Sequence, residues 1–206
     1  MIDPTKITNF NLSTPELEEC ILFWVCAAGK NGVTAAKSLD RLLSNFKSDC
    51  SPFETIRFID RQFNLADQMR IAGIGCFNNK SHTFRALVHS GINLKTCTVF
   101  DLEKIKGIGP KTARCFLMHS RPDQKFAGLD THVLKFLADC GIDVPKSTPN
   151  GRKYHHLELQ FLNICEKFNL AVADLDLLIW NVYSGRDKTF DSKSYLSKIS
   201  SAQRQL

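Results

Sequence analysis

The segment Leu102–Ala113 constrains the fold more than any other part of the sequence. It contains two glycines, Gly107 and Gly109, that flank a single apolar residue, Ile108. Glycine permits the positive φ angles and the close backbone approach that a tight turn needs. A proline directly after the second glycine suits the first turn of a helix. The pattern therefore predicts a helix–hairpin–helix over residues 99–119, with Ile108 inserted into the core beneath the turn.

The same hairpin predicts a phosphate-binding site. Backbone amides in the first turn of a helix lack intrahelical acceptors and lie at the positive end of the helix dipole. Gly107, Gly109 and Thr112 are expected to contact DNA at this point, because such amides bind a phosphate without reading a base. The alternative interpretation is a plain corner between two helices that binds nothing.

The rest of the chain also shows helical signals, and no window shows sustained strand alternation. Capping patterns begin at Ser13, Ser51 and Thr98, and apolar residues recur at helical spacing up to residue 183. We predict an all-α protein of two packed helical subdomains, with the functional cleft between them. One domain is expected over residues 1–185, followed by a basic, polar tail or short helix over residues 186–206.

Composition excludes several classes of protein. The formal net charge of +6 is compatible with a polyanionic partner. The longest apolar stretch, Cys20–Ala28, is too short to span a bilayer, and no leader pattern opens the chain, so we expect an intracellular protein with no membrane partner. Eight scattered cysteines with no Cys-x-x-Cys motif are typical of buried thiols in a reducing compartment. We expect no disulfide framework, no metal and no cofactor.

Two residues after the turn carry candidate chemistry. Lys111 is expected in the first turn of its helix, where the dipole and partial burial would lower the pKa of its ammonium group. A lysine with a lowered pKa is a nucleophile near neutral pH. Asp130 follows nineteen residues later, a separation that lets both side chains face one cleft. The competing interpretations are a solvated lysine and an ordinary helix cap.

Together these segments resemble the helix-hairpin-helix DNA glycosylases, the superfamily of endonuclease III and 8-oxoguanine DNA glycosylase. Besides the hairpin, the resemblance rests on Ile74–Lys80, on Gly128–Val133 and on Leu177–Tyr183. It extends over roughly residues 15–185. The sequence lacks the C-terminal cysteine cluster of endonuclease III and the extra N-terminal domain of the larger 8-oxoguanine enzymes.

The resemblance implies a base-excision repair enzyme that acts on damaged double-stranded DNA as a monomer and without a cofactor. In this family a lysine at the place of Lys111 marks enzymes that combine glycosylase and abasic-site (AP) lyase activity through a Schiff base. Asp130 would stabilise positive charge on the sugar, and His132 would contact a phosphate. The damaged nucleotide would be flipped out of the duplex.

The lesion is less well specified by the sequence. Cys115 lies one helical turn after Lys111, where the 8-oxoguanine enzymes have a cysteine against the flipped purine, and Trp180 is a second candidate for the base pocket. The loop after Cys26 is similar to the one from which those enzymes insert an asparagine. Here that position falls on a glycine, so Lys30 or Asn31 would have to fill the gap in the DNA.

We therefore expect 8-oxoguanine as the substrate. One alternative is an enzyme for oxidised pyrimidines such as thymine glycol. Another is a non-catalytic helix-hairpin-helix module that only binds DNA, and a third is a helical scaffold for protein partners.

Overall fold

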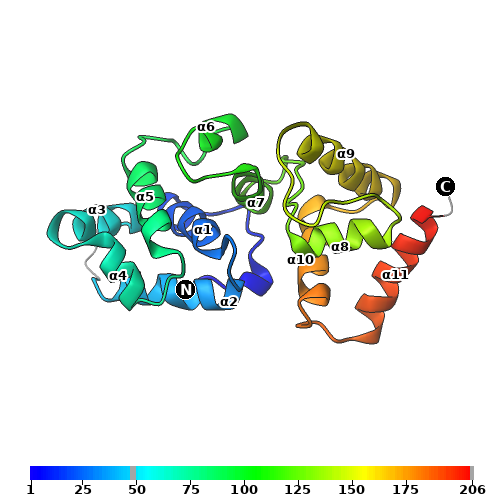
Figure 1. The fold of residues 1–206 in the computed structure, drawn as a ribbon, viewed down its shortest axis with the longest axis horizontal. Coiled ribbons are helices and arrows are strands. Elements are labelled where there is room, and N and C mark those ends of the chain that lie inside the picture. The colour runs from blue at the N-terminus through cyan, green and yellow to red at the C-terminus, as the bar shows by residue number, and fades with distance from the viewer. Residues whose placement is uncertain (47–49, 205–206) are drawn as a thin grey trace. The chain divides into compact units, whose positions relative to one another are not determined.

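The computed structural model describes residues 1–46 and 50–204, and within these ranges the chain is entirely helical, as predicted (Figure 1). The elements in chain order are η1 (Pro4–Lys6), α1 (Thr14–Ala27), α2 (Gly32–Ser44), α3 (Pro52–Gln62), α4 (Leu65–Ile71), α5 (Phe77–Val88), α6 (Val99–Glu103), α7 (Pro110–Ser120), α8 (Thr131–Asp139), α9 (Gly151–Lys167), α10 (Val172–Tyr183) and α11 (Phe190–Arg204). None of the helices in these ranges has the length and apolar character needed to cross a membrane.

The chain forms two helical units, Met1–Ser120 and Arg121–Leu206. Residues 190–204 of the predicted tail form α11, which packs on α8 and α10 within the second unit. Leu196 and Ile199 of α11 are buried. The domain boundary at residue 185 stays a prediction.

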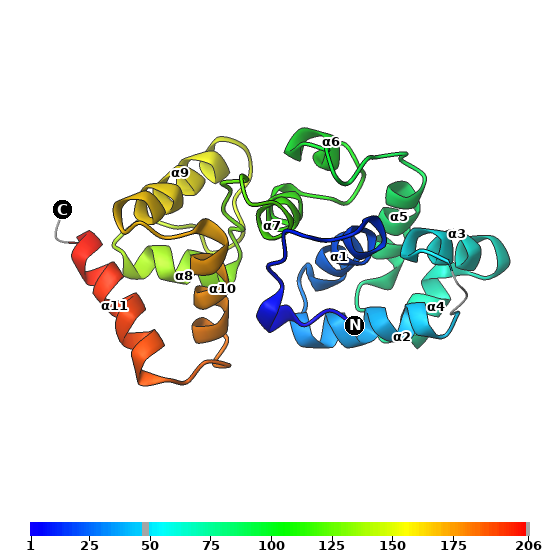
Figure 2. The same cartoon turned by 180° about the vertical axis from the view of Figure 1, so that it is seen from behind.

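Helix α1 is the centre of the first unit. Its residues 20–26 are all buried, so it is apolar on every side, as expected for a helix that others surround. Helices α2, α3, α5 and α7 pack against it, and both views of the ribbon show α1 between them (Figures 1 and 2). This arrangement places the second hairpin helix, α7, directly against α1.

The second unit has its own core, built from α8, α9, α10 and α11. Its fully buried aromatic side chains are Phe136 and Phe161, with Tyr154 almost fully buried beside them. Helix α8 packs mainly on α10. Ala127 and Leu129, from the loop that precedes α8, are buried in the same core.

Local capping explains where several helices begin. The side chain of Ser51 accepts a hydrogen bond from the amide of Glu54, whose carboxylate accepts one from the amide of Ser51. Thr98 and Asp101 form the same reciprocal pair at α6. These capping boxes satisfy amides that would otherwise lack acceptors, and both were predicted from the sequence.

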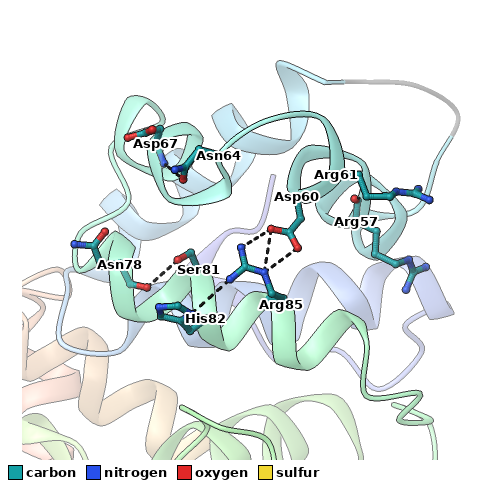
Figure 3. Close-up of polar contacts among 9 residues, drawn as sticks. All are labelled: Arg57, Asp60, Arg61, Asn64, Asp67, Asn78, Ser81, His82 and Arg85. Carbon is teal, nitrogen blue, oxygen red and sulfur yellow. Dashed lines mark hydrogen bonds and ion pairs between the residues drawn. The ribbon is translucent and has the colours of Figure 1, made fainter.

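An ion pair joins α3 to α5 (Figure 3). Arg85 Nε donates to Asp60 Oδ2 at 2.8 Å, and Arg85 Nη2 donates to Asp60 Oδ1 at 2.5 Å. Asp60 is largely shielded from solvent, and its hydrogen bonds to Arg85 lower the pKa of its carboxyl group. Bidentate pairs of this kind are among the stronger charged contacts in proteins, so the pair fixes α5, the helix that follows the turn at Gly73–Cys76.

Candidate active site

The hairpin at residues 99–119 has the geometry that the sequence predicts. Gly107 has a φ angle of +93°, a left-handed conformation that favours glycine. A Cβ atom on Gly107 would lie 1.9 Å from Thr83 Oγ1 of α5, whereas a Cβ on Gly109 would meet nothing within 4 Å. Ile108 is buried with 4% of its surface exposed. Gly107 is therefore required by close packing and Gly109 is not.

The turn leads into α7, whose first residue is Pro110. Gly107 and Gly109 are exposed, while the side chain of Thr112 is buried. If Thr112 contacts DNA, the contact is made by its backbone amide. Lys104 and Lys106 are exposed on the same hairpin, so positive charge lies on the segment that leads into these amides.

Lys111 lies in the first turn of α7 and is half-buried. Its Nζ lies over the indole ring of Trp24 in α1, 4.8 Å from the ring centroid. Trp24 has 9% of its surface exposed. The position in the helix and the partial burial agree with the sequence prediction, but the contact with Trp24 was not predicted.

A second aromatic contact supports Trp24 from further along α7. The ring of His119 stacks on the indole with 5.5 Å between centroids and 14° between planes. His119 is fully buried, and its Nδ1 lies 2.7 Å from the hydroxyl of Thr8. Cys115, between Lys111 and His119 on the same face of α7, is also buried.

Asp130 caps α8 in the second unit. Its Oδ1 accepts hydrogen bonds from the amides of His132 at 2.8 Å and Val133 at 3.0 Å. The cap that the sequence allows is therefore present. Both bonds end on the same oxygen, so capping does not engage Oδ2. A cap and a catalytic carboxylate can thus coexist in one side chain.

Two side chains of α9 fix the loop before Asp130. Tyr154 donates a hydrogen bond from its hydroxyl to the carbonyl of Ala127 at 2.7 Å and accepts one from the amide of Leu129 at 3.2 Å. Glu158 accepts a hydrogen bond from the amide of Ala127 at 3.0 Å. Tyr154 and Glu158 are both buried. Sequence reasoning missed these anchors, whose only signal was a tyrosine and a glutamate one helical turn apart in α9.

The loop between α1 and α2, which holds Lys30 and Asn31, is fixed in two ways. Asn31 caps α2, and its side chain accepts hydrogen bonds from the amides of Val33 and Thr34. Lys80 of α5 is buried, and its Nζ donates to the carbonyl of Cys26 near the end of α1 at 2.6 Å. Burial lowers the pKa of the Lys80 ammonium group. A buried amine thus holds the C-terminal end of α1.

Lys30 itself is exposed, and its side chain lies close to Gly75 of the α4–α5 turn. A Cβ atom on Gly75 would lie 2.2 Å from Lys30 Cε. The contact places Lys30 against the turn, whose last residue, Cys76, has a positive φ of 56°. Whether Lys30 or Asn31 enters DNA stays a prediction.

Trp180 of α10 is partly exposed, and the guanidinium of Arg186 lies 4.2 Å from its ring centroid. His132 is partly buried in the first turn of α8. Lys111, Cys115, Lys30 and Asn31 belong to the first unit, and Asp130, His132 and Trp180 belong to the second. The described residues contain no group of three or more metal-ligating side chains.

Comparison with known proteins decides the family. Residues 16–170 match the helix-hairpin-helix family described as 8-oxoguanine DNA glycosylase. The chain belongs to this family. Among curated relatives, it is 37% identical over 101 residues to the 8-oxoguanine DNA glycosylase/AP lyase of Methanocaldococcus jannaschii, a match that covers 48% of each chain. It is 33% identical over 85 residues to the enzyme of the same name from Picrophilus torridus, covering 41% of this chain and 40% of the relative. The matches thus span about half the length of these relatives or less.

Solved structures of the family have the same fold. The 8-oxoguanine DNA glycosylase of Thermotoga maritima has a TM-score of 0.66 at 20% identity, covering 87% of this chain and 86% of that one. The M. jannaschii 8-oxoguanine glycosylase/lyase, solved with a 15mer DNA containing 8-oxoguanine, has a TM-score of 0.65 at 25% identity, covering 88% of this chain and 87% of that one. The similarity therefore extends over both units.

Proposed function

We propose that this protein is a base-excision repair enzyme that removes 8-oxoguanine from double-stranded DNA and then cleaves the abasic strand. The observation that carries the proposal is the position of Lys111, half-buried in the first turn of the second hairpin helix. Binding of DNA alone would need the hairpin but no shielded lysine. The name and the DNA substrate of the M. jannaschii relative support the same lesion.

In the proposed reaction, the amine of Lys111 attacks C1′ of the flipped nucleotide. The bond from C1′ to the base breaks, and the base leaves with the bonding electrons and takes up a proton. Loss of the amine proton and opening of the sugar ring give a Schiff base between Nζ and C1′. This intermediate permits loss of the C2′ proton and β-elimination of the 3′ phosphate. Asp130 stabilises the positive charge that develops on the sugar as the base departs.

The hairpin amides at Gly107 and Gly109, the amide of Thr112 and the imidazole of His132 are proposed to contact the DNA backbone. Lys30 or Asn31 is proposed to enter the gap that the flipped base leaves. Cys115 and Trp180 are proposed to contact the flipped base. We further propose that the enzyme works as a monomer inside the cell, where the DNA is.

Borohydride trapping tests the proposal. The enzyme is mixed with labelled duplexes that contain 8-oxoguanine, thymine glycol, uracil, an abasic site or no damage, and the covalent product is measured. We expect trapping on 8-oxoguanine and on the abasic site by the native protein. Lys111→Gln should keep DNA binding and lose trapping, while Lys37→Gln, which changes an exposed lysine of α2, should behave as the native protein.

Each other outcome has a defined meaning. Trapping on thymine glycol in place of 8-oxoguanine would identify an oxidised-pyrimidine enzyme. Salt-sensitive binding to every duplex, with no base release and no trapping, would identify a binding module. Full strand cleavage by Lys111→Gln would show that the nucleophile is another group.

A further inference from the structure

The contact between Lys111 and Trp24 has a consequence for the lysine's reactivity. The indole face carries negative charge density and attracts an ammonium group, with an energy that grows when the pair is shielded from water. Lys111 Nζ lies 4.8 Å from the indole centroid, and Trp24 is 9% exposed. Because the contact is shielded from water, it favours the protonated form of Lys111 over the neutral form. It also restricts the position of Nζ.

The indole is itself held in place. Trp24 and His119 stack at 5.5 Å, and Thr8 holds the imidazole of His119 through Nδ1 at 2.7 Å. Lys111 and His119 are two turns apart on α7, about 12 Å along the helix axis, and both contact the same indole. The stack extends from the N-terminal segment to α7 and leaves the indole little freedom to turn away from the lysine.

We propose that Trp24 is a positioning residue for Lys111: its indole face holds the ammonium group before reaction and sets how readily that group gives up its proton. The proposal rests on the proposed function, because it concerns the nucleophile of that reaction. It assigns to Trp24 an effect opposite to that of the helix dipole and of burial, both of which favour the neutral amine.

Other titratable groups face α7 and must be separated from this effect. On α1, burial raises the pKa of the Cys20 thiol to about 12, so it stays protonated in the range of the experiment. The carboxylates of α1 have partners away from the stack: Glu16 with Ser13, Glu18 with the amide of Phe53 and Glu19 with the N-terminus. On α6, Glu103 pairs with Arg114 of α7 at 2.6 Å. Cys115 and His119 are the remaining groups on α7.

A series of fluorinated tryptophans tests the proposal without changing the packing. Each fluorine withdraws charge from the ring face, and nonsense suppression at codon 24 places the analogue at this position alone. The readout is the pH dependence of borohydride trapping on 8-oxoguanine duplex, whose acid limb reports the proton lost from the nucleophile. A weaker attraction favours the neutral amine, so the acid limb should move to lower pH, by about 0.5 to 1 pH unit across the series.

Two controls make the result specific. The same analogues placed at Tyr195, an exposed position of α11 that has no part in the proposed site, in a protein that keeps Trp24, should leave the acid limb where it is. The acid limb is also measured in a His119→Gln protein that keeps the native Trp24, where it should still be present because the titrating group is the lysine. Loss of the acid limb in this protein would assign it to His119 and overturn the proposal.

The failure of this inference can be distinguished from the failure of the proposed function. If the enzyme is trapped normally and the acid limb stays fixed through the position-24 series, Trp24 does not act on Lys111, and the proposed function stands. If the native protein is trapped on no duplex of the panel, the proposed function is overturned and the inference with it.

Discussion

Tyr154→Phe is expected to be the most damaging change of a single atom in the second unit. The Tyr154 hydroxyl joins the carbonyl of Ala127 to the amide of Leu129, and both of these residues are fully buried. Phenylalanine keeps the ring but leaves both backbone groups without this partner. Each buried polar group that loses its partner costs about 1–3 kcal/mol, so the loss of both should lower the unfolding free energy by about 2–6 kcal/mol.

Urea denaturation measures this loss. With a slope of about 2 kcal/mol per molar urea, the midpoint should fall by about 1–3 M. Base release should also slow, by roughly tenfold to a hundredfold, because the loop from Ala127 to Leu129 leads directly into Asp130. Tyr195→Phe is the matched control: Tyr195 is 43% exposed, and the midpoint should change little. If Tyr154→Phe unfolds at the urea concentration of the native protein, Tyr154 does not hold the loop.

Three further predictions concern packing, the first two in the first unit and the third in both units. Gly107→Ala should lower the unfolding free energy by about 2–4 kcal/mol, because it adds a clash with α5 to the strain of a positive φ. Gly109→Ala should lower it by less than about 1 kcal/mol. Urea denaturation of both proteins measures the two losses, and equal losses would contradict the hairpin geometry. Asp60→Asn should destabilise the protein at pH 7 and much less at pH 2. The pKa of the Asp60 carboxyl group is lowered on folding, so its ionised form stabilises the folded protein at pH values above its unfolded pKa of about 3.9. That contribution is lost as the pH falls through the lower pKa of the folded state. If the difference in unfolding free energy between the two proteins does not change with pH, the ion pair is not its cause. A thiol reagent under native conditions should modify Cys50 and Cys76 quickly, since the other six cysteines are buried. Mass spectrometry of the labelled peptides identifies the modified sites. Rapid labelling of any of the six buried cysteines would contradict the packing.

The features that the sequence predicted correctly depend on contacts between near neighbours in the chain. A capping box joins residues three apart, as at Ser51 and Thr98. The turn of the hairpin is likewise local, because the positive φ of Gly107 is a property of the backbone at that residue, whereas its packing against Thr83 of α5 is not. Lys111 could be placed in the first turn of its helix for the same reason. Signals of this range are visible in a single sequence.

The features that the sequence did not predict join distant segments. Thr8 and His119 are 111 residues apart, Lys80 and Cys26 are 54 apart, and Tyr154 lies 27 residues from Ala127. In the sequence, Trp24 is one apolar residue of an amphipathic pattern, and nothing distinguishes it from a core residue. Its contact with Lys111 exists only because α7 packs on α1. Such contacts follow from tertiary packing, which residue spacing does not encode.

Because one carboxylate oxygen of Asp130 makes the helix cap and the other does not, a mutation at this residue can remove activity without removing the fold. Asparagine caps a helix as well as aspartate does, and one base substitution converts an aspartate codon into an asparagine codon. On the proposed mechanism the resulting protein would fold, keep α8 in place and still bind damaged DNA, yet release no base. Cellular quality control removes misfolded chains and would not recognise such a product. A population with this mutation would therefore contain the inactive protein at a normal level. The defect would be detected by a raised mutation rate in the population and not by a lowered amount of the protein.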